Sequence, residues 1–224
     1  MKHNLFKKNK KANHPQTHWN KLMKKKALIV IDVQNDFLPS GALAIPESNA
    51  ILPAVNNLIS RFDHVILTQD WHPKNHCSFA SFHLEKTPYD TVKLDYGLQI
   101  LWPDHCIQGT QGAEFHTSLE VEKAQLILRK GYNKEIDSCS AFFENDQKTP
   151  TGLHGYLKEH DFTTLFMCGL ATDFCVGFSA LHAVKCGFKV SVLLNACAGI
   201  DLNGSLNTML KVMNEAGVEL LMVS

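Results

Sequence analysis

A short run of apolar, partly β-branched residues near the start of the chain, Ala27 to Ile31, constrains the fold most strongly. A continuous apolar run of this length is typical of a strand buried on both faces of a parallel sheet. Similar runs recur and alternate with segments of helical spacing; further strands are expected at 64–69, 124–128, 163–168, 189–194 and 218–223, and helices at 49–62, 152–160, 173–187 and 203–216. The alternation predicts an α/β, doubly wound, three-layer fold with a six-stranded, mainly parallel sheet.

Charge divides the chain into two parts. Residues 1–26 contain nine lysines and no acidic residue, which leaves 13 basic and 22 acidic residues in the remainder. We expect residues 1–26 to be a disordered basic leader and residues 27–224 to form one domain. The acidic domain argues against a nucleic-acid partner, and no apolar run approaches the length of a membrane span. Seven cysteines without a regular framework predict free thiols and a cytoplasmic location.

The stretch Gly169–Val176 joins the apolar run 163–168 to the helical segment 173–187. Cys175 is therefore expected in the first turn of a helix, just beyond a strand end. Unpaired backbone N–H groups at that place favour a thiolate and can hold an oxyanion. A buried structural cysteine remains the alternative on this stretch alone.

Two more ionisable residues follow the ends of predicted strands. Asp32 follows the first strand, and Lys130 follows the third strand. Taken singly, Asp32 could cap a turn and Lys130 could be a surface lysine. In a doubly wound fold, however, the carboxyl ends of the strands meet at one edge, where such folds place their sites. Asp32, Lys130 and Cys175 should then share one cleft, as a base, a cation and a nucleophile.

A metal site is expected at the same edge. Asp70 and His72 follow the second strand, and residues two apart in an extended segment point the same way. His105 lies in the segment 77–112, which lacks periodicity and reads as a functional loop. Three protein ligands would leave open coordination positions on a divalent metal, which is the pattern of a catalytic site. Chance pairs of this kind are common among 12 histidines, so structural roles stay open.

Taken together, these motifs resemble the nicotinamidase/pyrazinamidase branch of the isochorismatase-like cysteine hydrolases. The likeness is collinear and covers roughly residues 27–224. The matching stretches are Asp32-Val-Gln-Asn-Asp-Phe37, Thr68-Gln-Asp-Trp-His-Pro73, Trp102-Pro-Asp-His-Cys106, Lys130-Gly131 and Gly169-Leu-Ala-Thr-Asp-Phe-Cys-Val176.

The resemblance implies a role for each matching residue. The implied groups are a triad of Asp32, Lys130 and Cys175; a metal site of Asp70, His72 and His105; substrate contacts from Phe37, Trp102 and Leu170; and an oxyanion hole from the N–H groups of Ala171 and Cys175. It also implies a cis peptide bond between Leu170 and Ala171 and one divalent metal ion, zinc being expected before iron or manganese. Relatives often have an aromatic residue near Cys139, and some have a further metal ligand at Ser78, so this chain departs from them at both positions.

The reaction implied by the resemblance is hydrolysis of nicotinamide, and of pyrazinamide, to the carboxylate and ammonia through a thioester on the cysteine. That activity belongs to NAD salvage. The expected partner is a small-molecule substrate, without nucleic acid or membrane, and the protein could form a homo-oligomer. Two alternatives stay open: another isochorismatase-like hydrolase, and a metal-binding or thiol protein without turnover. The absence of a C-x-x-C pair and the spread of the metal ligands over three stretches favour an enzyme.

Overall fold

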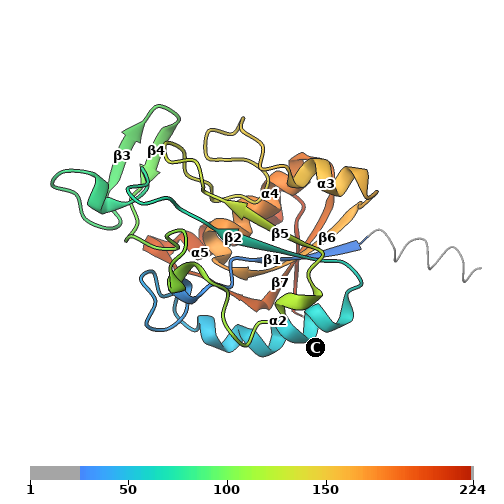
Figure 1. Cartoon of the computed structure of the whole chain (residues 1–224). Helices are drawn as coiled ribbons and strands as arrows, with labels where there is room; N and C mark the ends of the chain where they lie inside the picture. Colours follow the sequence, from blue (N-terminus) through green and yellow to red (C-terminus); the bar gives the residue numbers. More distant parts are fainter. Residues whose placement is uncertain (1–25, 223–224) are drawn as a thin grey trace, which may run out of the picture.

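The computed structural model describes residues 26–222 and has a six-stranded parallel sheet at its centre (Figure 1). The spatial order is β5-β2-β1-β6-β7-β8, and every pair of neighbours is parallel. The strands are β1 (Lys26–Ile31), β2 (Val65–Asp70), β5 (Leu126–Lys130), β6 (Thr164–Leu170), β7 (Lys189–Ala198) and β8 (Glu219–Leu221). The predicted fold class is confirmed. The predicted leader lies outside the described residues except for Lys26, which belongs to β1.

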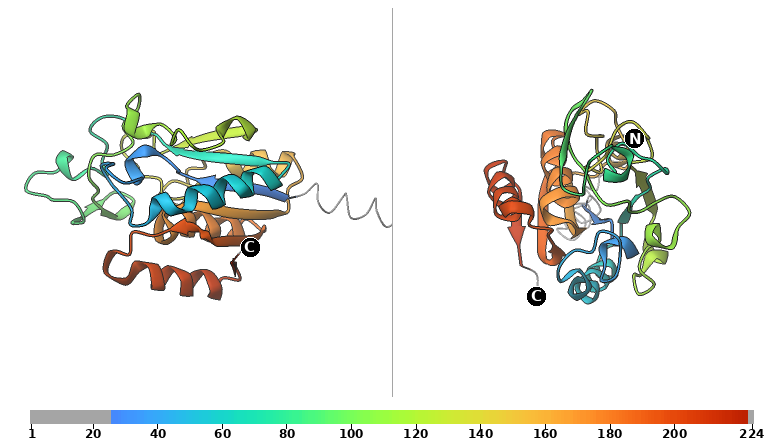
Figure 2. Two further views of the ribbon diagram at one scale, coloured as in Figure 1. Left: turned by 90° about the horizontal axis from the view of Figure 1, so that it is seen from below. Right: turned by 90° about the vertical axis from the view of Figure 1, so that its left-hand side faces the viewer.

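Helices cover both faces of the sheet (Figure 2). One face packs against α2 (Leu52–Arg61), and the other packs against α3 (Leu153–Glu159), α4 (Gly177–Lys185) and α5 (Ser205–Glu215). Side chains of β1 alternate between two apolar clusters, so that Leu28 joins the α2 side and Ile29 the opposite side. Each fully buried side chain of this kind contributes about 1.5–3 kcal/mol to folding. This two-sided burial explains the continuous apolar run in the sequence.

Two predicted elements differ in detail. The helix expected from residue 49 begins as a 3-10 turn, η2 (Ser48–Ile51), and Ser48 does not cap it with its side chain. The expected aperiodic loop contains a hairpin of β3 (Thr91–Leu94) and β4 (Gly97–Ile100), which extends beyond the sheet at the left of Figure 1. The remaining 3-10 turns are η1 (Asn35–Phe37), η3 (Ala80–Phe82), η4 (Gln111–Ala113), η5 (Val121–Lys123) and η7 (Leu202–Gly204). Short alternating strands carry a weaker signal than buried ones, so the hairpin was missed.

Strand register brings the predicted site residues to one edge. Asp70 on β2 pairs with Lys130 on β5, and Ile31 on β1 pairs with Gly169 on β6. Gly169 has φ +114°, and a Cβ there would lie 2.1 Å from the carbonyl oxygen of Ile31. Only glycine allows this approach of the two backbones. The carboxyl end of β1, with Asp32, therefore lies directly against the segment that leads to Cys175.

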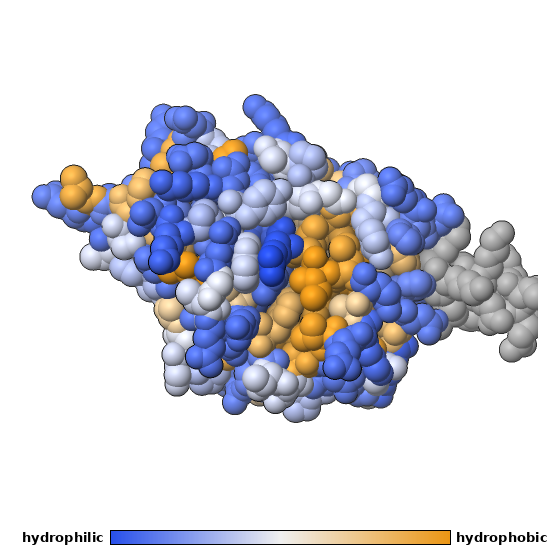
Figure 3. Space-filling model, viewed as in Figure 1, coloured by the Kyte–Doolittle hydropathy of each residue, from blue (hydrophilic) through white to orange (hydrophobic). Residues whose placement is uncertain are grey.

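The surface away from this edge is mixed. Figure 3 shows an apolar band in the middle of the face seen in Figure 1. β5 is one of the two edge strands of the sheet, and its residue Ile127 is 44% exposed. Among the helices between residues 26 and 222, none is both long enough and apolar enough to cross a membrane.

Candidate active site

Cys175 lies in a wide helical turn directly after β6. Residues Thr172–Val176 form a π-helical turn, in which the Val176 N–H donates to the Ala171 carbonyl oxygen at 3.0 Å, and α4 follows. The sequence predicted Cys175 in a first helical turn, which is confirmed, although the turn is wider than an α-helical one. The Leu170–Ala171 peptide bond is cis, as the family resemblance implied.

Asp173 fixes this turn to the segment before α5. Its Oδ1 accepts a hydrogen bond from the Ile200 N–H at 2.9 Å, and its Oδ2 accepts from the Asp201 N–H at 2.8 Å and from the Ser205 hydroxyl at 2.5 Å. The carboxylate is buried, with 2% of its residue surface exposed. Three donors satisfy the buried charge, so Asp173 holds the Cys175 turn in place.

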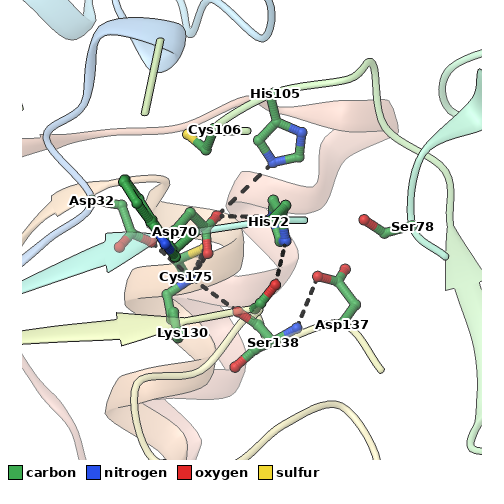
Figure 4. A network of polar contacts seen from close by, with 12 residues as sticks. Asp32, Asp70, His72, Ser78, His105, Cys106, Lys130, Asp137, Ser138 and Cys175 are labelled. Carbon is green, nitrogen blue, oxygen red and sulfur yellow. Dashed lines mark hydrogen bonds and ion pairs between the residues drawn. The ribbon is translucent and has the colours of Figure 1, made fainter. Parts of the chain in front are cut away.

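Lys130 is the centre of the polar network (Figure 4). Its Nζ lies 2.9 Å from Asp32 Oδ2, 2.5 Å from Asp70 Oδ1, 2.9 Å from the Ser138 carbonyl oxygen and 3.4 Å from Cys175 Sγ. The side chain is fully buried. Although burial alone would lower the pKa of Lys130, Asp32 and Asp70 raise it well above its usual range. Lys130 is therefore a charged ammonium group that joins the predicted triad to the predicted metal site.

Asp32 is placed to exchange a proton with the cysteine. Its Oδ1 accepts a hydrogen bond from the Thr68 hydroxyl at 2.6 Å, while Oδ2 pairs with Lys130 outside hydrogen-bond geometry and has no hydrogen-bond donor within residues 26–222. Carboxylate oxygens of Asp32 and Asp70 and the sulfur of Cys175 lie within 4.8 Å of one another. Burial raises the pKa of Asp32, an effect that Lys130 opposes. Asp32 Oδ2 thus pairs with the Lys130 ammonium without accepting a hydrogen bond, and it is the oxygen that can take up a proton.

The Cys175 thiol does not show the shift that the sequence suggested. Burial raises its pKa well above the usual range, and the nearby charge of Lys130 offsets this only in part. Desolvation therefore opposes the thiolate that the position of Cys175 led us to expect, whereas Lys130 favours it. The thiol form at neutral pH makes a nearby base necessary for any nucleophilic role.

Asp70, His72 and His105 converge as predicted. The Nε2 atoms of His72 and His105 lie 3.7 Å and 3.9 Å from Asp70 Oδ2, and one ligand atom from each residue lies within 4.8 Å of the others. His72 Nδ1 contacts the Gly131 carbonyl oxygen at 2.9 Å, and His105 Nδ1 contacts the Pro103 carbonyl oxygen at 2.8 Å. Both Nδ1 atoms must therefore carry hydrogen, which leaves the Nε2 lone pairs facing Asp70.

The electrostatics of His105 and Asp70 agree with a metal-binding role. Burial lowers the pKa of His105 to about 4, so its imidazole is neutral near pH 7. Although burial alone would raise the pKa of Asp70, Lys130 and the two histidines hold it well below its usual range. Burial alone would lower the pKa of His72, but the Asp70 carboxylate raises it. Two imidazoles and one carboxylate with oriented lone pairs fit zinc, iron or manganese.

His76 and Asp137 also reach this region, and the sequence reading missed both. His72, His76 and Asp137 form a second group with ligand atoms within 4.8 Å of one another. His76 contacts the Ser78 hydroxyl at 2.8 Å, and the Asp137 carboxylate accepts a hydrogen bond from Gln99 Nε2 at 2.7 Å. The spacing of His76, four residues after His72, offered a signal, whereas Asp137 follows no recognisable motif.

Aromatic side chains border the pocket. Phe37, Trp102 and Phe174 line a narrow cavity of about 30 Å³ together with Cys175. The rings of Trp102 and Phe174 meet edge to face, with centroids 4.9 Å apart and planes at 88°. Phe174 was not predicted as a site residue. Leu170 is fully buried at the end of β6, so its predicted contact with a substrate stays a prediction.

Comparison with known proteins identifies the family. A model of the isochorismatase domain matches residues 26–223. The chain belongs to the isochorismatase family. Within the family it is similar to the nicotinamidase of Acinetobacter baylyi, with 53% identity over 193 residues, covering 86% of this chain and 90% of that relative.

Solved structures of isochorismatase-family members agree with the fold. The nicotinamidase/pyrazinamidase of Acinetobacter baumanii has a TM-score of 0.88 and 54% identity, covering 89% of this chain and 96% of that one. The pyrazinamidase of Pyrococcus horikoshii, solved in complex with zinc, has a TM-score of 0.72 and 33% identity, covering 89% of this chain and 99% of that one.

Proposed function

We propose that this isochorismatase-family protein is a nicotinamidase, which hydrolyses nicotinamide, and also pyrazinamide, to the carboxylate and ammonia. The observation that carries the proposal is the position of Lys130, whose ammonium group contacts Asp32, Asp70 and Cys175 together. The nucleophile and the metal-binding residues thus line one pocket beside aromatic walls, and a carboxylate oxygen of the base lies within 4.8 Å of the sulfur. Nicotinamidases with more than half of their residues identical to this chain support the same substrate.

Asp32 and Cys175 carry the first half of the reaction. Asp32 Oδ2 takes the proton of the thiol, and the sulfur attacks the carboxamide carbon, so that a C–S bond forms and the carbonyl oxygen becomes an oxyanion. The backbone N–H groups of Ala171 and Cys175 hold the oxyanion. When the tetrahedral intermediate collapses, the C–N bond breaks, and Asp32 gives its proton to the departing ammonia.

Water completes the reaction. Asp32 accepts a proton from a water molecule, which attacks the thioester carbon, and the C–S bond then breaks to release nicotinate. The sulfur takes the proton back from Asp32, so the enzyme returns to its starting state. Lys130 stabilises negative charge on the sulfur and on Asp32 throughout.

Asp70, His72 and His105 are the residues that would hold a divalent metal ion, and we propose zinc. The oriented Nε2 lone pairs and the charged carboxylate support this assignment. The relative from Pyrococcus horikoshii was solved with zinc. When bound, the ion supplies a Lewis acid that can accept the pyridine nitrogen and polarise water. Phe37 and Trp102 would then orient the ring against Cys175.

The setting of the reaction follows from its substrate. A neutral pyridine amide is a small molecule, and its conversion to nicotinate places the enzyme in NAD salvage. All seven cysteines are free thiols, which supports a reducing compartment such as the cytoplasm.

The proposed function is tested by ammonia release. Purified full-length protein is incubated with nicotinamide or with pyrazinamide, and its metal content is measured on the same preparation. A metal-stripped sample of the protein is the control. We expect equimolar ammonia and nicotinate, with activity lost after chelation and restored by zinc. Stoichiometric metal without any ammonia release from either amide would contradict the proposal and favour a non-catalytic metal protein.

A further inference from the structure

A second hollow lies beside the catalytic pocket. Its volume is about 230 Å³, against about 30 Å³ for the catalytic pocket. The two share three lining residues, Trp102, Cys139 and Phe174. One water molecule needs roughly 10–15 Å³ of such space, so the second hollow has room for a substituent of several heavy atoms.

Cys139 is the smallest part of the shared wall. Trp102 and Phe174 stabilise each other's orientation through their edge-to-face contact. Cys139 is held by Asn145, whose Oδ1 accepts the Cys139 N–H at 3.0 Å and whose Nδ2 lies 3.8 Å from the sulfur. These contacts define the boundary between the two hollows, and the size of the side chain at position 139 sets how far it separates them.

The chemistry of the second hollow defines what can enter it. Apolar side chains such as Leu98, Ile100 and Phe178 form part of its lining, and Gln147 and His182 add polar atoms. None of its lining residues is aspartate, glutamate, lysine or arginine. A charged substituent would therefore find no ion-pair partner among these lining residues.

His182 adds a neutral imidazole ring to this lining. Its Nε2 pairs with Gln147 Oε1 at 2.7 Å, and its Nδ1 has no hydrogen-bond partner among the described residues. Burial lowers the pKa of His182, so the ring is neutral, with Nε2–H donating and Nδ1 carrying a lone pair. The hollow therefore suits a neutral, mainly apolar group.

We propose that Cys139 opens the catalytic pocket into this hollow, and that the enzyme hydrolyses nicotinamides whose ring carries a neutral extension. The proposal rests on the proposed nicotinamidase activity and names the residue that determines its substrate range. A bulky side chain at position 139 would close the passage and restrict the enzyme to the unsubstituted ring.

The test compares nicotinamide with four nicotinamides that carry one propyl group at ring position 2, 4, 5 or 6. For wild-type enzyme, we expect kcat/KM for at least one isomer within about tenfold of nicotinamide. Cys139→Tyr should lower kcat/KM for that isomer by roughly 100-fold relative to kcat/KM for nicotinamide, because a few clashing methylene groups cost this much. Cys139→Ser, which keeps the size of the side chain, should keep the wild-type ratio of the two kcat/KM values.

The outcomes separate this proposal from the proposed function. Nicotinamide hydrolysis by the wild type without turnover of any propyl isomer overturns the open passage and leaves the nicotinamidase assignment intact. An equal loss for nicotinamide and the accepted isomer in Cys139→Tyr also overturns it, since the hollow would then serve only as an entry path. If the tyrosine variant does not fold, the same comparison of kcat/KM values is made with Cys139→Met. Equal turnover of a carboxyethyl compound would overturn the requirement for a neutral extension.

Discussion

The carbonyl oxygen of Gly131 accepts the Nδ1–H of His72 at 2.9 Å, and Gly131 directly follows Lys130 in the chain. One short segment at the end of β5 therefore orients a predicted metal ligand and supplies the cation beside Cys175. Outer hydrogen bonds of this kind fix the imidazole tautomer and strengthen the ligand. Displacement of this segment should disturb both halves of the site together.

Gly131→Ala is expected to weaken metal binding. Gly131 has φ +66°, and an added Cβ would lie 2.5 Å from the Cε1 atom of the His72 ring. The ring must shift, so we expect metal affinity to fall about 10–100-fold, measured by titration of the stripped protein. Gly152→Ala is the matched control, since Gly152 also has positive φ, at +100°, but its Cβ would meet no atom within 4 Å. Equal metal affinity in the two variants would contradict the orienting role of Gly131.

Cys175→Ala is expected to abolish amide hydrolysis and to leave the fold and the metal content intact. The sulfur is the proposed nucleophile and is not one of the predicted metal ligands. Mass spectrometry of acid-quenched wild-type enzyme during turnover should show an acyl adduct on Cys175. Cys186→Ala, at the end of α4, serves as the control and should retain full activity. Residual activity of more than a few per cent in Cys175→Ala would rule out the covalent mechanism.

Lys130→Met is expected to inactivate the enzyme and to destabilise it. Removal of the buried ammonium leaves the carboxylates of Asp32 and Asp70 without their shared cation. Breaking a buried ion pair in this way costs about 3–5 kcal/mol, measurable by urea unfolding. The double variant Lys130→Met/Asp32→Asn removes one of the stranded charges and should recover part of the stability without activity. No recovery in the double variant would mean that Lys130 acts mainly through packing.

Elements that leave a local pattern in the sequence were predicted correctly, whereas features that depend on the packing of distant segments were not. β1 and β2 were predicted because burial on both faces leaves a continuous apolar run, and their parallel pairing brings Asp32 and Asp70 together. The raised pKa of the Cys175 thiol could not be predicted from the sequence, because desolvation depends on every group packed around the sulfur. Asp137 could not be found, since only the folded loop after β5 carries it to the pocket.

Removal of residues 1–22 is expected to change neither the melting temperature nor the turnover of nicotinamide. The sequence of this segment is basic and poor in apolar residues, so it has little to contribute to a core. Calorimetry and the ammonia assay on the shortened protein provide the measurement. Lost activity after removal would assign the segment to the site or to a subunit contact.

His72→Ala and His105→Ala are each expected to lower bound metal and to weaken nicotinamide binding. Each change removes one of the two oriented Nε2 lone pairs that face Asp70. The metal ion would then lose a ligand, and with it the geometry that leaves a coordination position open for the ring nitrogen. Metal analysis and KM values for nicotinamide give the measurement. His160→Ala, which removes an exposed imidazole at the end of α3, is the matched control and should change neither quantity.

Benzamide separates the two roles that a metal can have in this pocket. It has the carboxamide but no ring nitrogen, so it should be a poor substrate for the wild type and should lose less activity than nicotinamide in the two histidine variants. That difference would place the ring nitrogen at the metal, because only nicotinamide has a ring nitrogen that can coordinate the ion. Equal losses for both compounds would assign the metal to water activation or to structure. Unchanged metal content in both variants would remove the ion from His72 and His105 altogether.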